Sequence, residues 1–216
     1  MPPADPRDDR QLRALIEDRL RGTVPGGDPL AHLTRDRTPE EVEVVRSLVP
    51  KQYSRAAVLV PIVERPEGLT LLLTQRASHL KNHPGQISFP GGRVESADEG
   101  PVAAALRETE EEIGLARTHV SPIGYLADHA VISGYVVTPV VAFVRPGFAL
   151  TLDATEVEEV FEVPLPFVLD PAHHVPRELS FHGHRFIAYD IPYEGHNIWG
   201  ATAAMLISLS RLLEGR

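Results

Sequence analysis

Four glutamates lie within five positions of one predicted helix, and their spacing is the strongest chemical signal in the sequence. The segment ALRETEEEIGL at 105–115 contains Glu108, Glu110, Glu111 and Glu112. Like charges three or four residues apart destabilise a helix, so a compensating cation is expected. At about 100° per residue, Glu108, Glu111 and Glu112 project together, whereas Glu110 projects away from them. Convergent carboxylates suit the hard cations Mg²⁺ and Mn²⁺.

The residues on either side of these glutamates favour a metal site over an ordinary solvated acidic face. Gly91 and Gly92 lie upstream, and adjacent glycines allow the backbone to approach a metal or a phosphate closely. Gly114 lies downstream, where it can end the helix. Arg107 precedes Glu111 by four residues and can form an ion pair with it. A loop, helix and loop with these residues in this order are rare by chance.

This order of residues resembles the signature of the Nudix hydrolases, G-x5-E-x7-R-E-U-x-E-E-x-G-U, in which U is a bulky aliphatic residue. We call this signature the box. The matching positions are Gly92, Arg107, Glu108, Glu111, Glu112, Gly114 and Leu115. Thr109 replaces an aliphatic residue, and the span from Gly92 to Arg107 is one residue longer than in the signature. Asp98 keeps the spacing from the glycine and Glu99 keeps the spacing to the arginine, so the place of the first glutamate is open to both.

The resemblance implies a hydrolase that cuts a phosphoanhydride bond and depends on Mg²⁺ or Mn²⁺. It also implies that Glu108, Glu111 and Glu112 hold the cations together with the Gly91 carbonyl, and that Arg107 orients a glutamate. The fold of the family is an α/β/α sandwich around a mixed β-sheet.

A second resemblance concerns the substrate. The segment LLTQRASHLKNHPGQISFPGG at 72–92 resembles the signature of the coenzyme A pyrophosphatase branch, in which the lengthened box is also typical. Weaker similarities lie at 133–141, 156–165 and 199–203. The branch implies hydrolysis of coenzyme A to adenosine 3′,5′-bisphosphate and 4′-phosphopantetheine. The alternatives are a Nudix hydrolase for another nucleotide such as ADP-ribose, and a catalytically silent nucleotide-binding module, against which the intact arginine and glutamate series argues.

Four side chains close in sequence to the glycine loop can donate hydrogen bonds to an anionic substrate. They are Arg76, Lys81, His83 and Gln86. A nucleotide with a diphosphate and a 3′-phosphate carries several negative charges, so cationic donors would be useful in an acidic protein. The alternative for His83 and Gln86 is a structural role, as hydrogen-bond partners within a buried loop.

The general base is predicted from the resemblance, in an acidic segment outside the box. The segment ATEVEEVFEVPL at 154–165 contains Glu156, Glu158, Glu159 and Glu162. In the related branch the recurrent glutamate precedes V-x-x-V-F, and it corresponds here to Glu156. Glu108, on the box helix, is the alternative base.

Other candidates are weaker. We expect Trp199 to be a core residue rather than a stacking platform for a base. We expect the histidine pairs His173-His174 and His182-x-His184 to be surface residues rather than metal ligands. Tyr135 can contact substrate or pack within a strand.

Apolar periodicity predicts the elements that position these residues. Helices are expected over 8–22, from a capping box at Thr38 to Leu48, over 99–113 and over 199–213. Strands are expected over 56–63 and 69–76 as a hairpin, over 123–128 and 135–145, and as a second hairpin around His182-Gly183. We expect one compact unit, in which residues 1–50 form a helical extension packed on a Nudix domain at 51–216.

Composition limits the partners of the protein. The 216 residues are 43% hydrophobic and 24% charged, and no cysteine is present, so a metal must bind oxygen or imidazole. The net charge of −9 argues against sequence-independent binding to nucleic acid. No apolar run is long enough to span a membrane, and the N-terminus does not resemble a signal peptide. We therefore expect a cytoplasmic protein with a small-molecule substrate, and the sequence leaves a homodimer open.

Overall fold

Three long strands form the centre of the main sheet in a computed structural model that describes residues 6–35, 37–48, 50, 52–131, 133–181 and 184–215. They are β1 (Ser54–Arg65), β2 (Gly68–Arg76) and β7 (Tyr135–Val144). β1 pairs antiparallel with β2, which confirms the predicted hairpin, and parallel with β7, so the sheet is mixed. The remaining strands are β3 (Ile87–Ser88), β4 (Gly91–Arg93), β5 (Val120–Tyr125), β6 (His129–Val131) and β8 (Val157–Pro164).

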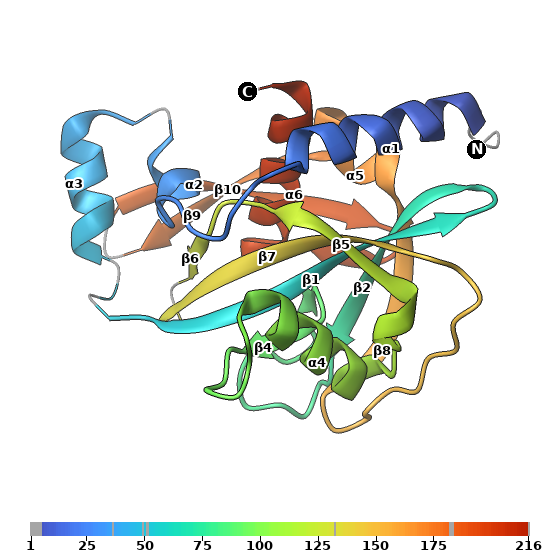
Figure 1. Ribbon diagram of the computed structural model, residues 1–216. Coiled ribbons are helices and arrows are strands. Elements are labelled where there is room, and N and C mark those ends of the chain that lie inside the picture. The colour runs from blue at the N-terminus through green and yellow to red at the C-terminus, as the bar shows by residue number, and fades with distance from the viewer. Residues whose placement is uncertain are drawn as a thin grey trace.

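The order of the sheet places the ends of several strands around the glycine loop. The described strands run β3-β2-β1-β7-β5, with β4 beside β1, β6 beside β7 and β8 beside β2. β4 and β8 are far apart in sequence, yet they flank the same hairpin (Figure 1). Residues from the box and from the acidic segment therefore reach one region of the sheet.

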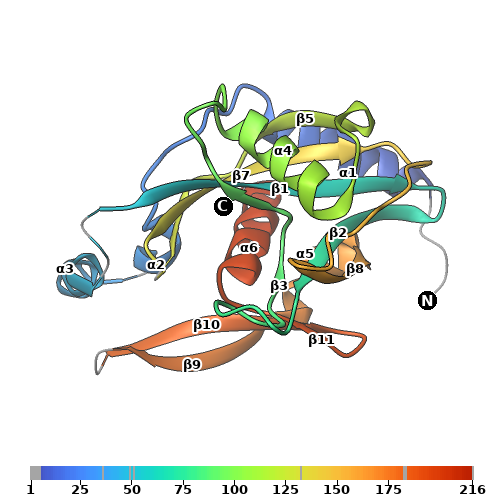
Figure 2. The ribbon, with the colours of Figure 1, turned by 90° about the horizontal axis from the view of Figure 1, so that it is seen from below.

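Alternation of side chains along the strands gives the sheet two apolar faces. On β1, Val60 and Ile62 belong to one core, whereas Ala57 and Leu59 belong to the other. Helix α4 (Pro101–Ile113) covers the second face, and helix α6 (Gly200–Glu214) lies on the opposite side of the sheet (Figure 2). The predicted α/β/α sandwich around a mixed sheet is confirmed.

The N-terminal helix contributes to the same core as α6. In α1 (Pro6–Leu20), Ile16 and Leu20 are fully buried, as the helical spacing predicts. Short α2 (Ala31–Thr34) and α3 (Pro39–Leu48) follow. The capping box that opens α3 is confirmed, because the backbone N–H groups of Thr38 and Glu41 each donate to the other residue's side chain. The boundary near residue 50 stays a prediction.

The C-terminal third contains more structure than the sequence pattern indicated. Helix α5 (Leu165–Leu169) precedes a three-stranded sheet of β9 (Val175–Phe181), β10 (His184–Tyr193) and β11 (His196–Ile198). The predicted hairpin is confirmed, although its turn at residues 182–183 lies outside the described residues. Among the described helices, none is both long and apolar enough to cross a membrane.

One predicted strand has the wrong limits. The strand expected over 123–128 is replaced by β5, which ends at Tyr125, and by the separate short strand β6. The pairing of β5 with β7 shifts register between Pro122 and Gly124, and such an irregularity bends a strand. An ideal Cβ on Gly124 would lie 2.5 Å from the Leu20 carbonyl, so this bend accommodates the end of α1.

Candidate active site

Two glycines of β4 place the backbone directly against the glutamates of α4. The Gly91 N–H donates to Oε2 of Glu112 at 3.0 Å. Gly91 has φ 148°, and a Cβ there would lie 2.4 Å from the Ala57 carbonyl oxygen. At Gly92 a Cβ would lie 2.5 Å from the Glu108 carboxylate carbon. Only residues without side chains fit between the central strand and these carboxylates, so the glycines form the floor of the site.

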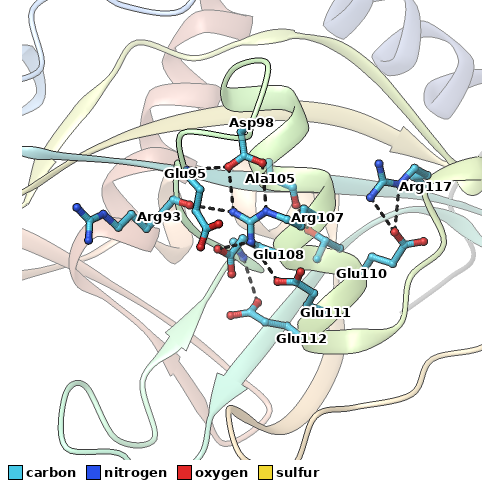
Figure 3. Close-up of polar contacts among 12 residues, drawn as sticks. Arg93, Glu95, Asp98, Ala105, Arg107, Glu108, Glu110, Glu111, Glu112 and Arg117 are labelled. Atoms are coloured by element: carbon cyan, nitrogen blue, oxygen red, sulfur yellow. Dashed lines mark hydrogen bonds and ion pairs between the residues drawn. The ribbon is translucent and has the colours of Figure 1, made fainter.

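Arg107 holds three acidic side chains in place (Figure 3). Its Nε and Nη2 donate to the two carboxylate oxygens of Asp98 at 3.1 and 3.0 Å. Nη1 donates to Glu108 at 2.9 Å and to Glu111 at 3.1 Å, which confirms the predicted pair with Glu111. Nη2 also donates to the Arg93 carbonyl at 3.1 Å. These contacts engage both edges of the guanidinium, so its position is fixed.

The structure resolves which residue takes the first acidic position of the box. The Asp98 side chain is only 6% exposed and accepts both hydrogen bonds from Arg107, whereas Glu99 is exposed. These Arg107 hydrogen bonds, and a further one from the Glu95 backbone, lower the pKa of Asp98. The residue that keeps the spacing from the glycine is therefore the one that contacts the arginine.

The remaining positions of the box have structural roles. Glu110 points away from the other glutamates and pairs with Arg117 at 2.8 Å, as its helical angle predicted (Figure 3). Thr109, which departs from the signature, is buried and donates from Oγ1 to the Ala105 carbonyl at 2.6 Å. Its hydroxyl is therefore satisfied within the helix. Gly114 ends α4 with φ 69°, in the left-handed region that glycine favours.

Burial and neighbouring charges make Glu112 hard to ionise. Burial, together with the charges of Glu156 and Glu108, raises the pKa of Glu112 to about 8. The Gly91 hydrogen bond and the charge of Arg76 act in the opposite direction. Negative charge is therefore in excess around the Glu112 carboxylate, and an added cation would relieve it.

Glu108 has the same kind of environment. Burial raises the pKa of its carboxyl group, and the charges of Glu111 and Glu156 add to this effect against the opposing contact with Arg107. Glu156 thus acts on both Glu108 and Glu112, although it is 44 positions away from Glu112 in the sequence.

The loop before β8 brings Glu156 to the box. The N–H of Asp153 donates to the Glu112 carbonyl at 2.9 Å, which ties this loop to the end of α4. The Asp153 carbonyl then accepts from the N–H groups of Glu156 and Val157, and its carboxylate accepts from Thr155. Asp153 was not among the residues predicted from the sequence. The D-x-T spacing of an Asx turn was the available signal.

The four glutamates of the acidic segment have different surroundings. The Glu158 carboxylate accepts from the Ser78 N–H, Glu159 pairs with His196, and Glu162 pairs with Arg65. Among the described residues, the exposed Glu156 carboxylate has no hydrogen-bond or ion-pair partner. Three of the four glutamates are thus in structural contacts, and Glu156 faces the carboxylates of the box.

The predicted substrate-binding residues lie on one loop, from the end of β2 to the start of β3. We call this loop, residues 76–86, the basic loop. The Arg76 N–H donates to the Gln86 carbonyl at 3.0 Å, so these two residues meet at the base of the loop. Lys81 and His83 are exposed farther along it, and His83 has φ 55°. Among the described residues, the Arg76, Lys81 and His83 side chains have no hydrogen-bond or ion-pair partner. The buried-loop alternative is therefore wrong for His83.

The weaker candidates are distributed elsewhere. His173 and His174 contact the carbonyl oxygens of α5, so they have structural surroundings. Tyr135 packs against the main core. Trp199 was expected in the core, but it is 37% exposed at the N-terminal end of α6. His182 lies outside the described residues, which also leave out the His184 side chain.

The donors around Gly91 fit a hard divalent cation in chemistry. They are carboxylate and carbonyl oxygens, and the two glycines let the Glu108 and Glu112 carboxylates approach the backbone closely. Burial and the charges of Glu156 and Glu108 raise the pKa of Glu112, and a bound cation would oppose this shift. In the described part of the chain, no three or more histidine, aspartate or glutamate side chains already stand close enough together to hold an ion. Ion binding would thus require side-chain rotation, in which the Glu111 side chain, 61% exposed, would leave its ion pair with Arg107.

Comparison with known proteins agrees with this geometry. A family model described as the NUDIX domain matches residues 53–181, which include the box, the basic loop and the acidic segment. The chain belongs to the Nudix family. It is 40% identical over 161 residues to the uncharacterized Nudix hydrolase NudL of Shigella flexneri serotype 5b, covering 74% of this chain and 83% of that relative. It is 38% identical over 169 residues to NudL of Photorhabdus laumondii, covering 76% and 90%.

A solved Nudix structure has the same fold. RenU, a Nudix hydrolase from M. smegmatis, matches with a TM-score of 0.50 and 24% identity, over 76% of this chain and 86% of that one. The family match and the NudL relatives make the chain a hydrolase of the Nudix pyrophosphatase class, whose members generally depend on divalent metal ions. The sequence prediction of the family is confirmed.

Proposed function

We propose that this Nudix hydrolase cuts the diphosphate bond of coenzyme A or a derivative, giving adenosine 3′,5′-bisphosphate and 4′-phosphopantetheine. The observation that supports it most is the position of Arg76. Its charge acts on Glu112, and its backbone contacts Gln86 in the loop that resembles the coenzyme A pyrophosphatase signature. The site thus joins a carboxylate cluster to a basic loop, as a substrate with a diphosphate and a further phosphate requires.

Glu108, Glu111, Glu112 and the Gly91 carbonyl are the groups that would hold Mg²⁺ or Mn²⁺. Such a cation neutralises diphosphate oxygens and makes water a better nucleophile. Arg107 pairs with Glu108 and Glu111, so these two side chains are held beside the site before the cation binds. Groups that are already held in place need little reorganisation when charge develops in the transition state, so they stabilise that charge more effectively.

The chain's own groups supply the remaining steps. Arg76, Lys81 and His83 would bind phosphate oxygens, because their side chains are available. Glu156 would accept a proton from the attacking water. The water oxygen bonds to one phosphorus while the bond from that phosphorus to the bridging oxygen breaks, and the bridging oxygen leaves with the other phosphate. The assignment of Glu156 is supported by its place beside Glu108 and Glu112 and by the structural contacts of the other three glutamates. Glu108 is the alternative base.

The test compares substrates under one set of conditions. Purified protein is incubated with coenzyme A, dephospho-coenzyme A, ADP-ribose and nucleoside triphosphates, with Mg²⁺ or Mn²⁺, and products are identified by mass. We expect the highest kcat/KM for coenzyme A. The 3′-phosphate should improve kcat/KM about tenfold to a hundredfold over dephospho-coenzyme A, because a charge-assisted hydrogen bond contributes about 1.5 to 3 kcal/mol.

Each of the other outcomes would indicate a different function for this protein. Faster turnover of ADP-ribose or a triphosphate would reject coenzyme A and retain the Nudix hydrolase. Tight nucleotide binding without turnover of any substrate would indicate a silent binding module. Equal kcat/KM for coenzyme A and its dephospho form would remove the 3′-phosphate from recognition.

A further inference from the structure

The chain has one tryptophan, and its side chain is partly exposed beside the N-terminal end of α6. Trp199 is 37% exposed, whereas its neighbour Ile198 is fully buried. It lies at the N-terminal end of α6 with extended backbone angles, and its side chain does not cap the helix. The exposed part of the indole is not covered by apolar side chains in the free protein, and binding surfaces commonly contain such residues.

One side of the indole ring is occupied by a cation. The Arg177 guanidinium carbon lies 4.8 Å from the centre of the Trp199 ring. Arg177 is itself held by Asp190, whose Oδ1 is 3.4 Å from its Nε. A cation over the ring face is attractive and restricts rotation of the ring. The indole is therefore a fixed surface, and its exposure leaves area for a flat ligand.

Trp199 is linked to the carboxylate cluster through the base of the basic loop. It follows β11, which lies beside β3 (Figure 2). It precedes Gly200, where a Cβ would lie 3.3 Å from the Gln86 amide nitrogen. Gln86 accepts the hydrogen bond of Arg76, and the charge of Arg76 acts on Glu112. These contacts place the indole at the outer end of a row of residues that begins at the carboxylates.

We propose that Trp199 stacks against the adenine base of the nucleotide substrate and thereby fixes which end of the substrate lies along the basic loop. This inference rests on the function proposed above. An adenine base is flat and aromatic on both faces, whereas the pantetheine arm has no aromatic ring to stack. The diphosphate would then lie at Arg76 and the carboxylates, with the pantetheine arm extending beyond the box.

The single tryptophan makes the test direct, because the indole fluorescence of the whole chain comes from this side chain. Metal is removed with EDTA to prevent turnover, and the full-length protein is titrated with coenzyme A, adenosine 3′,5′-bisphosphate and 4′-phosphopantetheine. We expect a saturable fluorescence change with the two ligands that contain adenine, and none with 4′-phosphopantetheine. An unchanged signal while calorimetry shows adenosine 3′,5′-bisphosphate bound would overturn the proposal.

Substitutions separate stacking from a structural role. Trp199→Ala should raise KM for coenzyme A about fivefold to a hundredfold, since base stacking on an aromatic ring contributes about 1 to 3 kcal/mol. Trp199→Phe should recover most of this loss, and kcat should change less than twofold. Inhibition by adenosine 3′,5′-bisphosphate should weaken in Trp199→Ala, whereas inhibition by 4′-phosphopantetheine should not, a selectivity that a structural defect would not produce.

The failures of the two proposals can be told apart. Normal coenzyme A turnover with an unchanged KM in Trp199→Ala rejects the stacking role and leaves the function intact. Should Trp199→Ala not fold, Trp199→Phe and the fluorescence of the unaltered protein still decide. Saturable quenching by adenine nucleotides, without hydrolysis of coenzyme A, rejects the proposed reaction and supports the stacking surface.

Discussion

Replacing Glu112 by glutamine should make the metal-free protein more stable while removing its activity. The Glu112 carboxyl is buried, 6% exposed, and its pKa is raised to about 8 by burial and by the nearby carboxylates. Glutamine retains an oxygen that can accept from the Gly91 N–H, but it has no charge. A group whose pKa is raised on folding stabilises the protein below its unfolded pKa, and this contribution is lost as pH rises.

The window for this loss runs from about pH 4.5, the unfolded pKa, to about 8, the folded pKa. Between pH 5 and pH 7 the folded protein holds about one more proton than the unfolded chain. The linkage relation then gives a loss of about 2 to 3 kcal/mol in the free energy of unfolding. For a chain of this size that corresponds to about 5 to 10 °C in Tm.

Thermal unfolding followed by circular dichroism in EDTA, at pH 5, 6, 7 and 8, measures this directly. The Tm difference between Glu112→Gln and the unaltered protein should be small at pH 5 and widen at each step. Added Mg²⁺ should raise the Tm of the unaltered protein more than that of the variant. Turnover of the variant should fall at least about a hundredfold, a loss of about 3 kcal/mol in transition-state stabilisation. A Tm difference independent of pH would refute the electrostatic reasoning.

Three further substitutions test other parts of the structure. Glu156→Gln should lower kcat more than the control Glu158→Gln does, with little change in coenzyme A affinity. Glutamine at 158 retains an oxygen that can accept from the Ser78 N–H. If the two variants have equal rates across pH, the base lies elsewhere. Gly92→Ala should lower activity at least about tenfold, a barrier of about 1.4 kcal/mol, because the new methyl group overlaps the Glu108 carboxylate, and steady-state kinetics measures it. The pKa of His32 is lowered to about 3 by burial, so stability should fall by about 1 to 2 kcal/mol from pH 6.5 to pH 5, and denaturant titrations of His32→Phe should show a smaller fall.

The elements that sequence predicted are those whose signals are local. Helices α1, α3, α4 and α6 each have apolar periodicity or a cap within their own residues. Several of the missed elements, among them β6, β11 and α5, are only three to five residues long. They exist because neighbouring strands or the main core supply their partners, and no periodicity can be counted over so few positions. The error at 123–128 also comes from a contact that is distant in sequence, because the bend in β5 depends on the position of α1.

The same distinction applies to the site. Helical geometry alone predicted that three box glutamates would project together, with Glu110 apart. The one-residue insertion left Asp98 and Glu99 equivalent in sequence, and only the folded loop brings Asp98 to Arg107. The exposure of Trp199 also depends on tertiary structure, because an apolar residue at the start of an apolar helix has no local signal that it lies outside the core.

The fit of α1 against the sheet affects how this protein can be divided. The matched family segment begins at residue 53, yet Ile16 and Leu20 are fully buried and the Leu20 carbonyl occupies the space that a side chain on Gly124 would need. A fragment that starts at residue 53 would present an apolar face to water and should aggregate or recruit another chain. The segment that the family model matches is therefore shorter than the unit that folds with its core covered.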